Sequence, residues 1–280
     1  MTPTLVQHHP NTTSPTAYTR VCTRARDWAE IQERMLVPLY EAVYERLEVG
    51  PATRLLGLDC GAGLALLVAA SRGAKVTGVD TDPALIALAR ERLVDGAVAP
   101  DTAAAVIHGC PSDATGPAPY NLVTAFEPIG CAAGDTDGLT PALDAAVPLV
   151  GRGSAVVLTG WGPPERCATS AVLRVACRLT DTLRTSGGWR PALRDDLEDV
   201  AARAGLKPDG SGRVACPFGY GDMDSAVRGL LSTGLFDAAV RATDPAQVEK
   251  ELAEALHPHL RADGTVWMPN VFRYLIARKP

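Results

Sequence analysis

The sequence lacks several features that would each indicate a class of protein. Aromatic residues make up 5% of its 280 residues, and its longest apolar runs, such as LALLVAA, are too short to span a bilayer. The first twenty residues contain neither a basic segment nor an apolar one, so no secretory signal is expected. We therefore expect a cytoplasmic protein without a membrane partner.

Cysteine and charge patterns exclude further classes. The seven cysteines form no C-x-x-C pair, which argues against a zinc site and against a disulfide framework, and we expect them to be small buried hydrophobes with no metal bound. The net charge is −5, and the Lys and Arg residues are scattered, so no nucleic-acid partner is expected. A homo-oligomer is compatible with this composition.

The remaining pattern is an alternation of strands and helices. Residues 1–16 are rich in Thr, Pro, Asn and His, which predicts a flexible tail. Residues 17–280 are expected to form one domain, which begins with a helical cap over residues 17–50. Alternation predicts a parallel sheet with helices on both faces. Strands are expected near residues 54–59, 75–80, 103–108, 121–126, 153–161, 213–218 and 270–277, and helices near 28–47, 63–72, 81–93, 140–150, 164–179 and 195–204.

A helical insertion is expected between the last two strands. Residues 219–268 contain short helices with recognisable caps, among them Asp222 and an Asp244–Gln247 capping box. We interpret this segment as a lid or a wall of a substrate pocket, because insertions at a sheet edge commonly provide specificity.

A glycine-rich turn carries the main functional signal. The stretch LGLDCGAGLAL places Gly61 and Gly63 between a strand and a helix, and Asp80 ends the next strand. This is the general plan for a ribose-bearing cofactor, with the acid accepting hydrogen bonds from the ribose hydroxyls. A tight structural turn is the simpler alternative. Leu66 stands where a dinucleotide fingerprint has its third glycine, and no Tyr-x-x-x-Lys pair is present, so a nicotinamide-dependent oxidoreductase is disfavoured.

Taken together, these motifs resemble the class I S-adenosylmethionine-dependent methyltransferases, in particular small-molecule enzymes of actinobacterial type. The resemblance covers residues 28–280. It rests on these stretches: WAEIQE, LLGLDCGAGLAL, VTGVDTDPALIALARERL, YNLVTAF, WGPPERC and NVFRYLIARKP. It implies a Rossmann-like, seven-stranded α/β sheet with an antiparallel last strand and bound S-adenosylmethionine. We expect methyl transfer to an O, N or C atom of a small-molecule acceptor from secondary metabolism.

The resemblance also assigns site residues. The cofactor-binding residues it implies are Asp59, Gly61, Ala62, Gly63, Asp80, Thr81, Cys110, Asp113 and Phe126. Two positions depart from the family: Gly57 replaces the usual acid that helps to hold the methionine amino group, and Cys110 replaces an acid that receives the adenine amino group. Asp59 is the candidate replacement for the first acid, and its simpler alternative role is to cap the following helix. Asp113 is the candidate replacement for the second acid, and its simpler alternative role is that of a solvated loop residue.

No residue is assigned as the catalyst, since the sulfonium already carries an activated methyl group. Glu127, which follows the fourth strand, and His257, near the end of the insertion, are candidate bases, although a helix-end His often only complements the helix dipole. His108 is expected in the core. A non-methylating binding or cyclase-like member of the same fold is the alternative function.

Overall fold

The computed structural model describes residues 15–95, 104–116, 118–129, 139–181 and 196–280. Its centre is a seven-stranded sheet in the order β3-β2-β1-β4-β5-β9-β6. The strands are β1 Arg54–Leu58, β2 Lys75–Asp80, β3 Ala104–His108, β4 Tyr120–Ile129, β5 Val150–Trp161, β6 Lys207–Ala215 and β9 Val271–Arg278. β9 pairs antiparallel with β5 and β6, whereas β1 to β5 pair in parallel. The predicted Rossmann-like α/β fold, with its antiparallel last strand, is confirmed.

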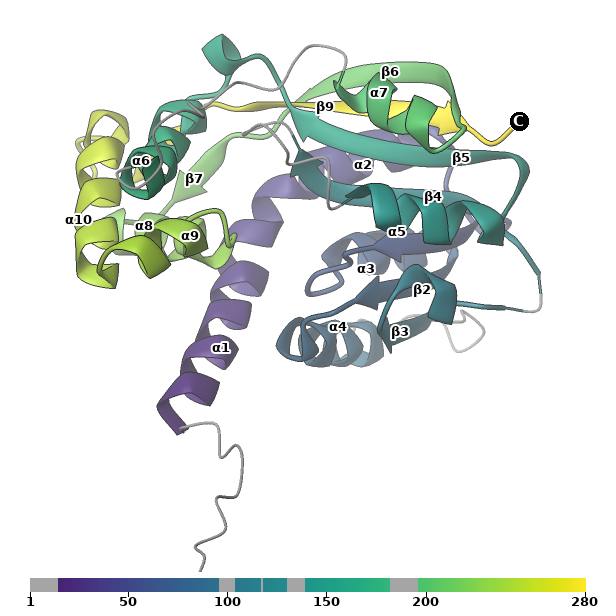
Figure 1. Cartoon of the computed structure of the whole chain (residues 1–280), viewed down its shortest axis with the longest axis horizontal. Coiled ribbons are helices and arrows are strands. Elements are labelled where there is room, and N and C mark those ends of the chain that lie inside the picture. Colours follow the sequence, from purple (N-terminus) through teal and green to yellow (C-terminus); the bar gives the residue numbers. More distant parts are fainter. Residues whose placement is uncertain (1–14, 96–103, 117, 130–138, 182–195) are drawn as a thin grey trace, which may run out of the picture.

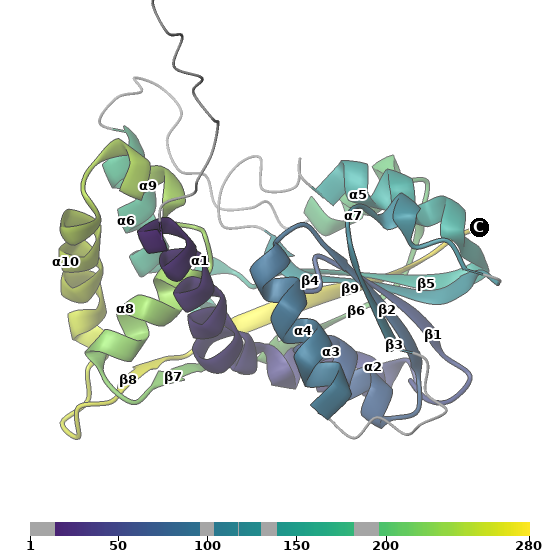
Figure 2. The ribbon, with the colours of Figure 1, turned by 90° about the horizontal axis from the view of Figure 1, so that it is seen from below.

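Helices cover both faces of this sheet, as Figure 2 shows. On one side lie α2 Val37–Arg46, α3 Leu64–Ser71 and α4 Pro83–Asp95, and on the other lie α5 Leu139–Ala146 and α7 Asp196–Arg203. Successive β1 residues point to opposite faces: Leu55 packs into one apolar cluster and Leu56 into the other. A central strand buried on both faces must be apolar throughout, which explains the unbroken run in its sequence.

A group of helices, the side bundle, lies beside the sheet in Figure 1. It consists of α6 Thr169–Asp181, α8 Met223–Ser232, α9 Asp237–Ala242 and α10 Pro245–Leu256, which pack on one another. A two-stranded ribbon of β7 Phe218–Tyr220 and β8 Val266–Met268 adjoins it. Helix α1 Pro15–Asp27 contacts both α8 and α4, so it connects the bundle to the sheet's helical layer.

Short helical turns complete the described chain. They are η1 Trp28–Gln32, η2 Glu33–Leu36, η3 Pro111–Asp113, η4 Val147–Leu149, η5 Pro164–Arg166 and η6 His257–His259. Within the described residues, no helix combines the length and apolar character that crossing a bilayer requires. The predicted tail lies outside this range except for its last two residues, which begin α1.

Several local expectations were wrong. The helical layer expected over 28–47, with a break and restart at Pro38, does restart there as α2, but its first part is the π-helical η1 and the 3-10 turn η2 instead of an α-helix. The strand expected over 213–218 divides between β6 and β7. Asp244 does cap α10, but Gln247 bonds to Glu251 instead of closing a capping box.

Two assignments to the core were also wrong, because β3 forms an edge of the sheet. His108, at the end of β3, is exposed, and so is Cys110 just after it. Among the other described cysteines, Cys60, Cys167 and Cys216 are buried, and Cys22 and Cys177 are half-buried. Cys131 lies outside the described residues.

Candidate functional site

The turn after β1 depends on its glycines. Gly61 and Gly63 have φ values of +56° and +79°, a left-handed conformation that favours glycine. A Cβ atom at Gly61 would lie 2.9 Å from Nε1 of Trp28, and one at Gly63 would lie 2.9 Å from Cβ of Ala89. Larger residues would therefore both strain the turn and push away the helices that close over it.

Asp80 holds this turn from the end of β2. One carboxylate oxygen accepts a 2.8 Å hydrogen bond from the Gly61 N–H, and the other accepts one of 2.9 Å from the Asp82 N–H. Asp82 in turn caps α4 by accepting from the N–H of Ala84 at 2.8 Å. The Asp80 side chain is thus fixed by backbone donors at the carboxyl edge of the sheet.

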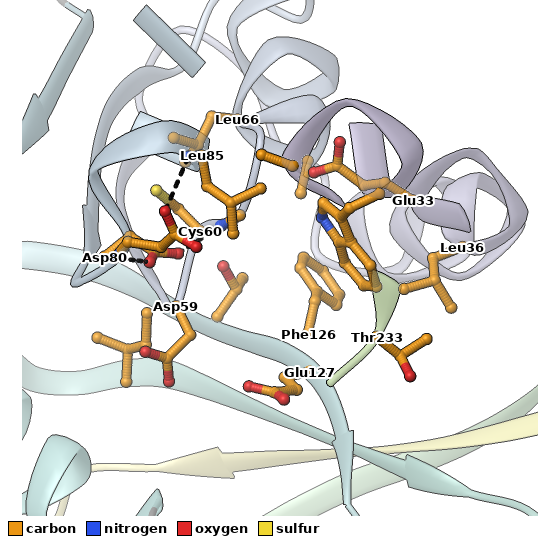
Figure 3. A pocket seen from close by; sticks show the side chains of 18 of the residues that line it. Glu33, Leu36, Asp59, Cys60, Leu66, Asp80, Leu85, Phe126, Glu127 and Thr233 are labelled. Carbon is orange, nitrogen blue, oxygen red and sulfur yellow. Dashed lines mark hydrogen bonds between the residues drawn. The ribbon is translucent and has the colours of Figure 1, made fainter. Parts of the chain in front are cut away.

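Asp59 occupies an unusual position between β1 and the turn. Its φ is +45°, so a non-glycine residue adopts the left-handed conformation here. Its side chain reaches the same cavity as Asp80 (Figure 3). Partial desolvation in the cavity, together with the negative charge of Asp80, raises the pKa of the Asp59 carboxyl. The site therefore favours a positively charged ligand group near Asp59.

A leucine fills the space beside Gly57, the position at which the family that this chain resembles has an acid. A Cβ atom at Gly57 would lie 2.9 Å from Cδ2 of Leu66, and one at Gly78 would lie 2.4 Å from Cδ1 of the same leucine. Leu66 is buried between these two strand glycines. Leu66 therefore occupies the room that the absence of side chains at Gly57 and Gly78 leaves.

The cavity over this turn has a volume of about 250 Å³. It lies at the carboxyl ends of β1, β2 and β4, next to the point where the strand order reverses, which is where open α/β sheets bind ligands. Other walls come from α1, η1, η2 and the C-terminal end of α8. The polar and charged lining residues are Arg24, Trp28, Glu33, Tyr40, Asp59, Asp80, Thr81, Asp82, Thr124, Glu127, Ser232 and Thr233.

Phe126 and Glu127 bring the end of β4 to the cavity (Figure 3). The Phe126 ring is buried against Tyr40 and Tyr44, with centroid distances of 4.7 and 5.6 Å. Glu127 is exposed, and it lines the cavity next to Phe126. An aromatic surface and an acid thus stand side by side where a ligand would enter.

Glu33 lines the cavity, although no sequence motif assigned it a role there. Its buried carboxylate forms a 2.6 Å ion pair with Arg92 of α4 and accepts from the Leu64 N–H at 3.2 Å. Burial raises the pKa of the Glu33 carboxyl, although the Arg92 charge opposes the shift. Arg92 also donates to the carbonyl oxygens of Ala62 and Ala29. This Glu33–Arg92 clamp joins η2, the glycine turn and α4.

Among the predicted cofactor residues, Asp59, Gly61, Asp80, Thr81 and Phe126 line the cavity. Ala62 and Gly63 belong to the turn but are not part of the lining. Cys110 and Asp113 are not among the lining residues; they belong to the η3 turn and its cap, where the Asp113 carboxylate accepts from the Cys110 N–H at 2.9 Å. This bond lowers the pKa of the Asp113 carboxyl.

Of the two candidate bases, only Glu127 lines the cavity. His257 is an exposed residue at the end of α10 and does not contribute to the lining. Across the part of the chain that the structure describes, no cluster of three or more His, Cys, Asp or Glu residues is arranged to hold a metal ion.

Structural comparison relates this fold to solved proteins. YjhP from E. coli is 18% identical, has a TM-score of 0.54, and covers 92% of this chain and 100% of its own. A SAM-dependent methyltransferase from Thiobacillus denitrificans, solved with S-adenosyl-L-homocysteine, is 16% identical, with a TM-score of 0.52 and coverages of 93% and 98%. The (4+2)-cyclase SpnF is 16% identical, with a TM-score of 0.50 and coverages of 86% and 80%.

These similarities establish the fold. A scan against protein-family models and a search of curated proteins both found no match.

Proposed function

We propose that the protein binds S-adenosylmethionine and transfers its methyl group to an oxygen, nitrogen or carbon atom of a small-molecule acceptor, in secondary metabolism. The observation that carries this proposal is the position of Asp80. Its carboxylate is fixed beside the glycine turn, at the edge of a cavity at the carboxyl ends of the strands. The methyltransferase of the same fold that was solved with S-adenosyl-L-homocysteine supports the choice of cofactor.

The cavity residues suit this cofactor chemically. Asp80 is suited to accept hydrogen bonds from two ribose hydroxyls, and Thr81 lies next to it. Asp59 provides a carboxylate for the methionine ammonium group, in place of the family's usual acid at the position that Gly57 occupies here. The buried N–H of Trp28 has no acceptor within the described structure, which leaves a donor for a ligand oxygen.

The cofactor supplies an activated methyl group, so the protein has to position the acceptor and exclude water. Phe126 and Glu127, at the end of β4, and Ser232 and Thr233, at the end of α8, surround the space that an acceptor would enter. Glu127 can take the proton from an acceptor whose nucleophilic atom must be deprotonated. In this proposal residues 219–268 act as a lid.

The other parts of the proposal follow from composition. A net charge of −5 with scattered basic residues favours a small-molecule partner over nucleic acid, and we place the reaction in the cytoplasm. Both a monomer and a homo-oligomer fit this function.

Calorimetric titration tests the cofactor assignment. We expect S-adenosylhomocysteine to bind the wild-type protein, NAD not to bind, and Asp80→Asn to lower the affinity by about 10- to 100-fold, since a charged acceptor of two hydroxyls is lost. Asp199→Asn is the matched control, because Asp199 is an exposed acid on α7, outside the cavity lining. Equal affinities for the wild type and Asp80→Asn would reject the ribose assignment.

A non-methylating, cyclase-like protein is the second candidate function. Gly57, which replaces the family's acid, and the likeness to SpnF favour it. Incubation with S-adenosylmethionine and a panel of phenols, amines and carbon acids distinguishes the two. Formation of S-adenosylhomocysteine with any acceptor supports methyl transfer, whereas tight cofactor binding without turnover favours the scaffold.

A further inference from the structure

Trp28 has a buried hydrogen-bond donor without an acceptor. Its indole Nε1 is excluded from solvent and has no hydrogen-bond partner within the described structure. An unsatisfied buried donor costs about 1–3 kcal/mol, so such groups are rare unless another molecule completes them. Trp28 lines the cavity, and its Nε1 lies against Gly61, the glycine that Asp80 holds. The unsatisfied donor is therefore part of the ligand cavity.

The backbone at Trp28 is also irregular. The turn η1 is π-helical, and the Glu33 N–H bonds to the carbonyl oxygen of Trp28, five residues earlier. Single π-helical turns occur frequently at functional sites, because the extra residue changes the direction of the side chains. Here the turn brings both Trp28 and Glu33 against the glycine turn. This irregular helix presents the indole to the cavity.

The charges around the cavity indicate which ligand group Trp28 would meet. Asp59, Asp80 and Glu127 lie at the ends of the strands, so that side attracts cationic groups. The Glu33 charge on the helical side is compensated by Arg92. Arg24, one helical turn before Trp28, is the cationic residue among the described lining residues. Arg24 is itself paired with Asp237 at 2.9 Å, so both charges on the helical side are compensated, and an anionic group is repelled less there than beside the three strand-end acids.

We infer that Trp28 is a cofactor-binding residue, whose indole N–H donates a hydrogen bond to the carboxylate of the cofactor's amino-acid end. This inference rests on the proposed function, which places the ribose at Asp80. With the ribose there, the ammonium group faces Asp59, and the carboxylate reaches the side formed by Arg24 and Trp28. The carboxylate completes the donor that the protein leaves unsatisfied.

The test compares two ligands that differ by the carboxylate alone. S-adenosylmethionine and decarboxylated S-adenosylmethionine are titrated into the wild type, Trp28→Phe and Trp267→Phe. The last variant is the control, since Trp267 is a 39% exposed residue away from the cavity lining. We expect Trp28→Phe to weaken the binding of S-adenosylmethionine by about 10-fold or more and to leave that of the decarboxylated compound unchanged, as for a bond to a charged acceptor.

Other outcomes overturn the inference and are distinguishable from failure of the proposed function. Equal weakening of both ligands would assign Trp28 a packing role, and no weakening would remove it from the site. If the wild type binds neither ligand, the proposed function itself fails. An NMR titration needs no variant of altered stability: the Trp28 indole N–H resonance should shift downfield with S-adenosylmethionine, and an unchanged resonance in the bound state would contradict the hydrogen bond.

Discussion

At the scale of single residues, Asp59 combines a costly backbone conformation with the role in ligand binding that we propose for it. A non-glycine residue in the left-handed conformation costs about 1–3 kcal/mol, and glycine would recover part of this while adding chain entropy to the unfolded state. Partial burial of the Asp59 carboxyl and, secondarily, the nearby Asp80 charge add to this cost, and both raise the pKa of that carboxyl. The protein thus retains an acid where its backbone favours glycine.

We predict that Asp59→Gly raises the free energy of unfolding by about 0.5–1 kcal/mol and weakens binding of S-adenosylhomocysteine. Urea unfolding and calorimetry measure the two effects. Glu48→Gly is the control: Glu48 also has a positive φ, of +50°, but lies outside the cavity, so its variant should gain stability and keep its affinity. A less stable Asp59→Gly protein with full affinity would contradict this account.

Acidification should weaken the same interaction in a defined direction. An ammonium group binds the ionised Asp59 carboxylate, and the raised pKa means that protonation begins at a higher pH than for an aspartate with the ordinary value of 3.8. Affinity for S-adenosylhomocysteine should therefore decrease as pH falls through this raised pKa. Asp59→Asn should remove this part of the pH dependence, and an identical pH profile in the variant would exclude Asp59 from the ammonium contact.

At the scale of elements, the Glu33–Arg92 clamp positions the glycine turn. It joins η2 to α4 and bonds to both ends of the turn, at Ala62 and Leu64. The two side chains are 3% and 19% exposed, so removing one partner leaves a charge in a poorly solvated place. Removing one partner of a buried ion pair generally destabilises a protein by about 3–5 kcal/mol. This cost exceeds the stability that the intact pair provides relative to a pair of apolar residues.

We predict that Arg92→Met lowers the free energy of unfolding by about 3 kcal/mol, and that adding Glu33→Gln recovers part of this, because the uncompensated charge is removed. Arg178→Met provides the control, since its ion pair with Glu251 is 3.7 Å long and its side chain is 68% exposed; its effect should stay below about 1 kcal/mol. Additive losses in the double variant, measured by urea unfolding, would show that the two residues act separately.

Elements close in sequence were the easiest to predict. Strands β1 and β2, the glycine turn and the start of α4 follow from local signals: apolar runs, positive-φ glycines and the Asp82 cap. Glu33 was missed as a residue of the cavity because its role depends on the π-helical turn before it and on contacts with residues about thirty positions or more away. A helical repeat of apolar residues does not reveal such a turn.

The edge position of β3 explains the errors around it. Its sequence is apolar, yet β3 pairs with β2 alone, so His108 is exposed. Strand order, which depends on contacts distant in sequence, is what separates a central apolar strand from an edge strand.

At the scale of the whole molecule, α1 connects the side bundle to the sheet. Ion pairs join Arg24 to Asp237 at 2.9 Å and Asp27 to Arg228 at 2.7 Å. These pairs are largely exposed and contribute little stability each, so the packing of α1 between α4 and α8 provides most of the connection. The antiparallel last strand could be expected from the family resemblance, but the placement of α6 with α8–α10 could not.

A crystal structure with S-adenosylhomocysteine tests the central claim most directly. The account predicts that the ribose hydroxyls lie within hydrogen-bond distance of the Asp80 carboxylate, with the sulfur directed toward Phe126 and Glu127. A ligand bound with its ribose away from Asp80, or outside the cavity over the glycine turn, would contradict the account.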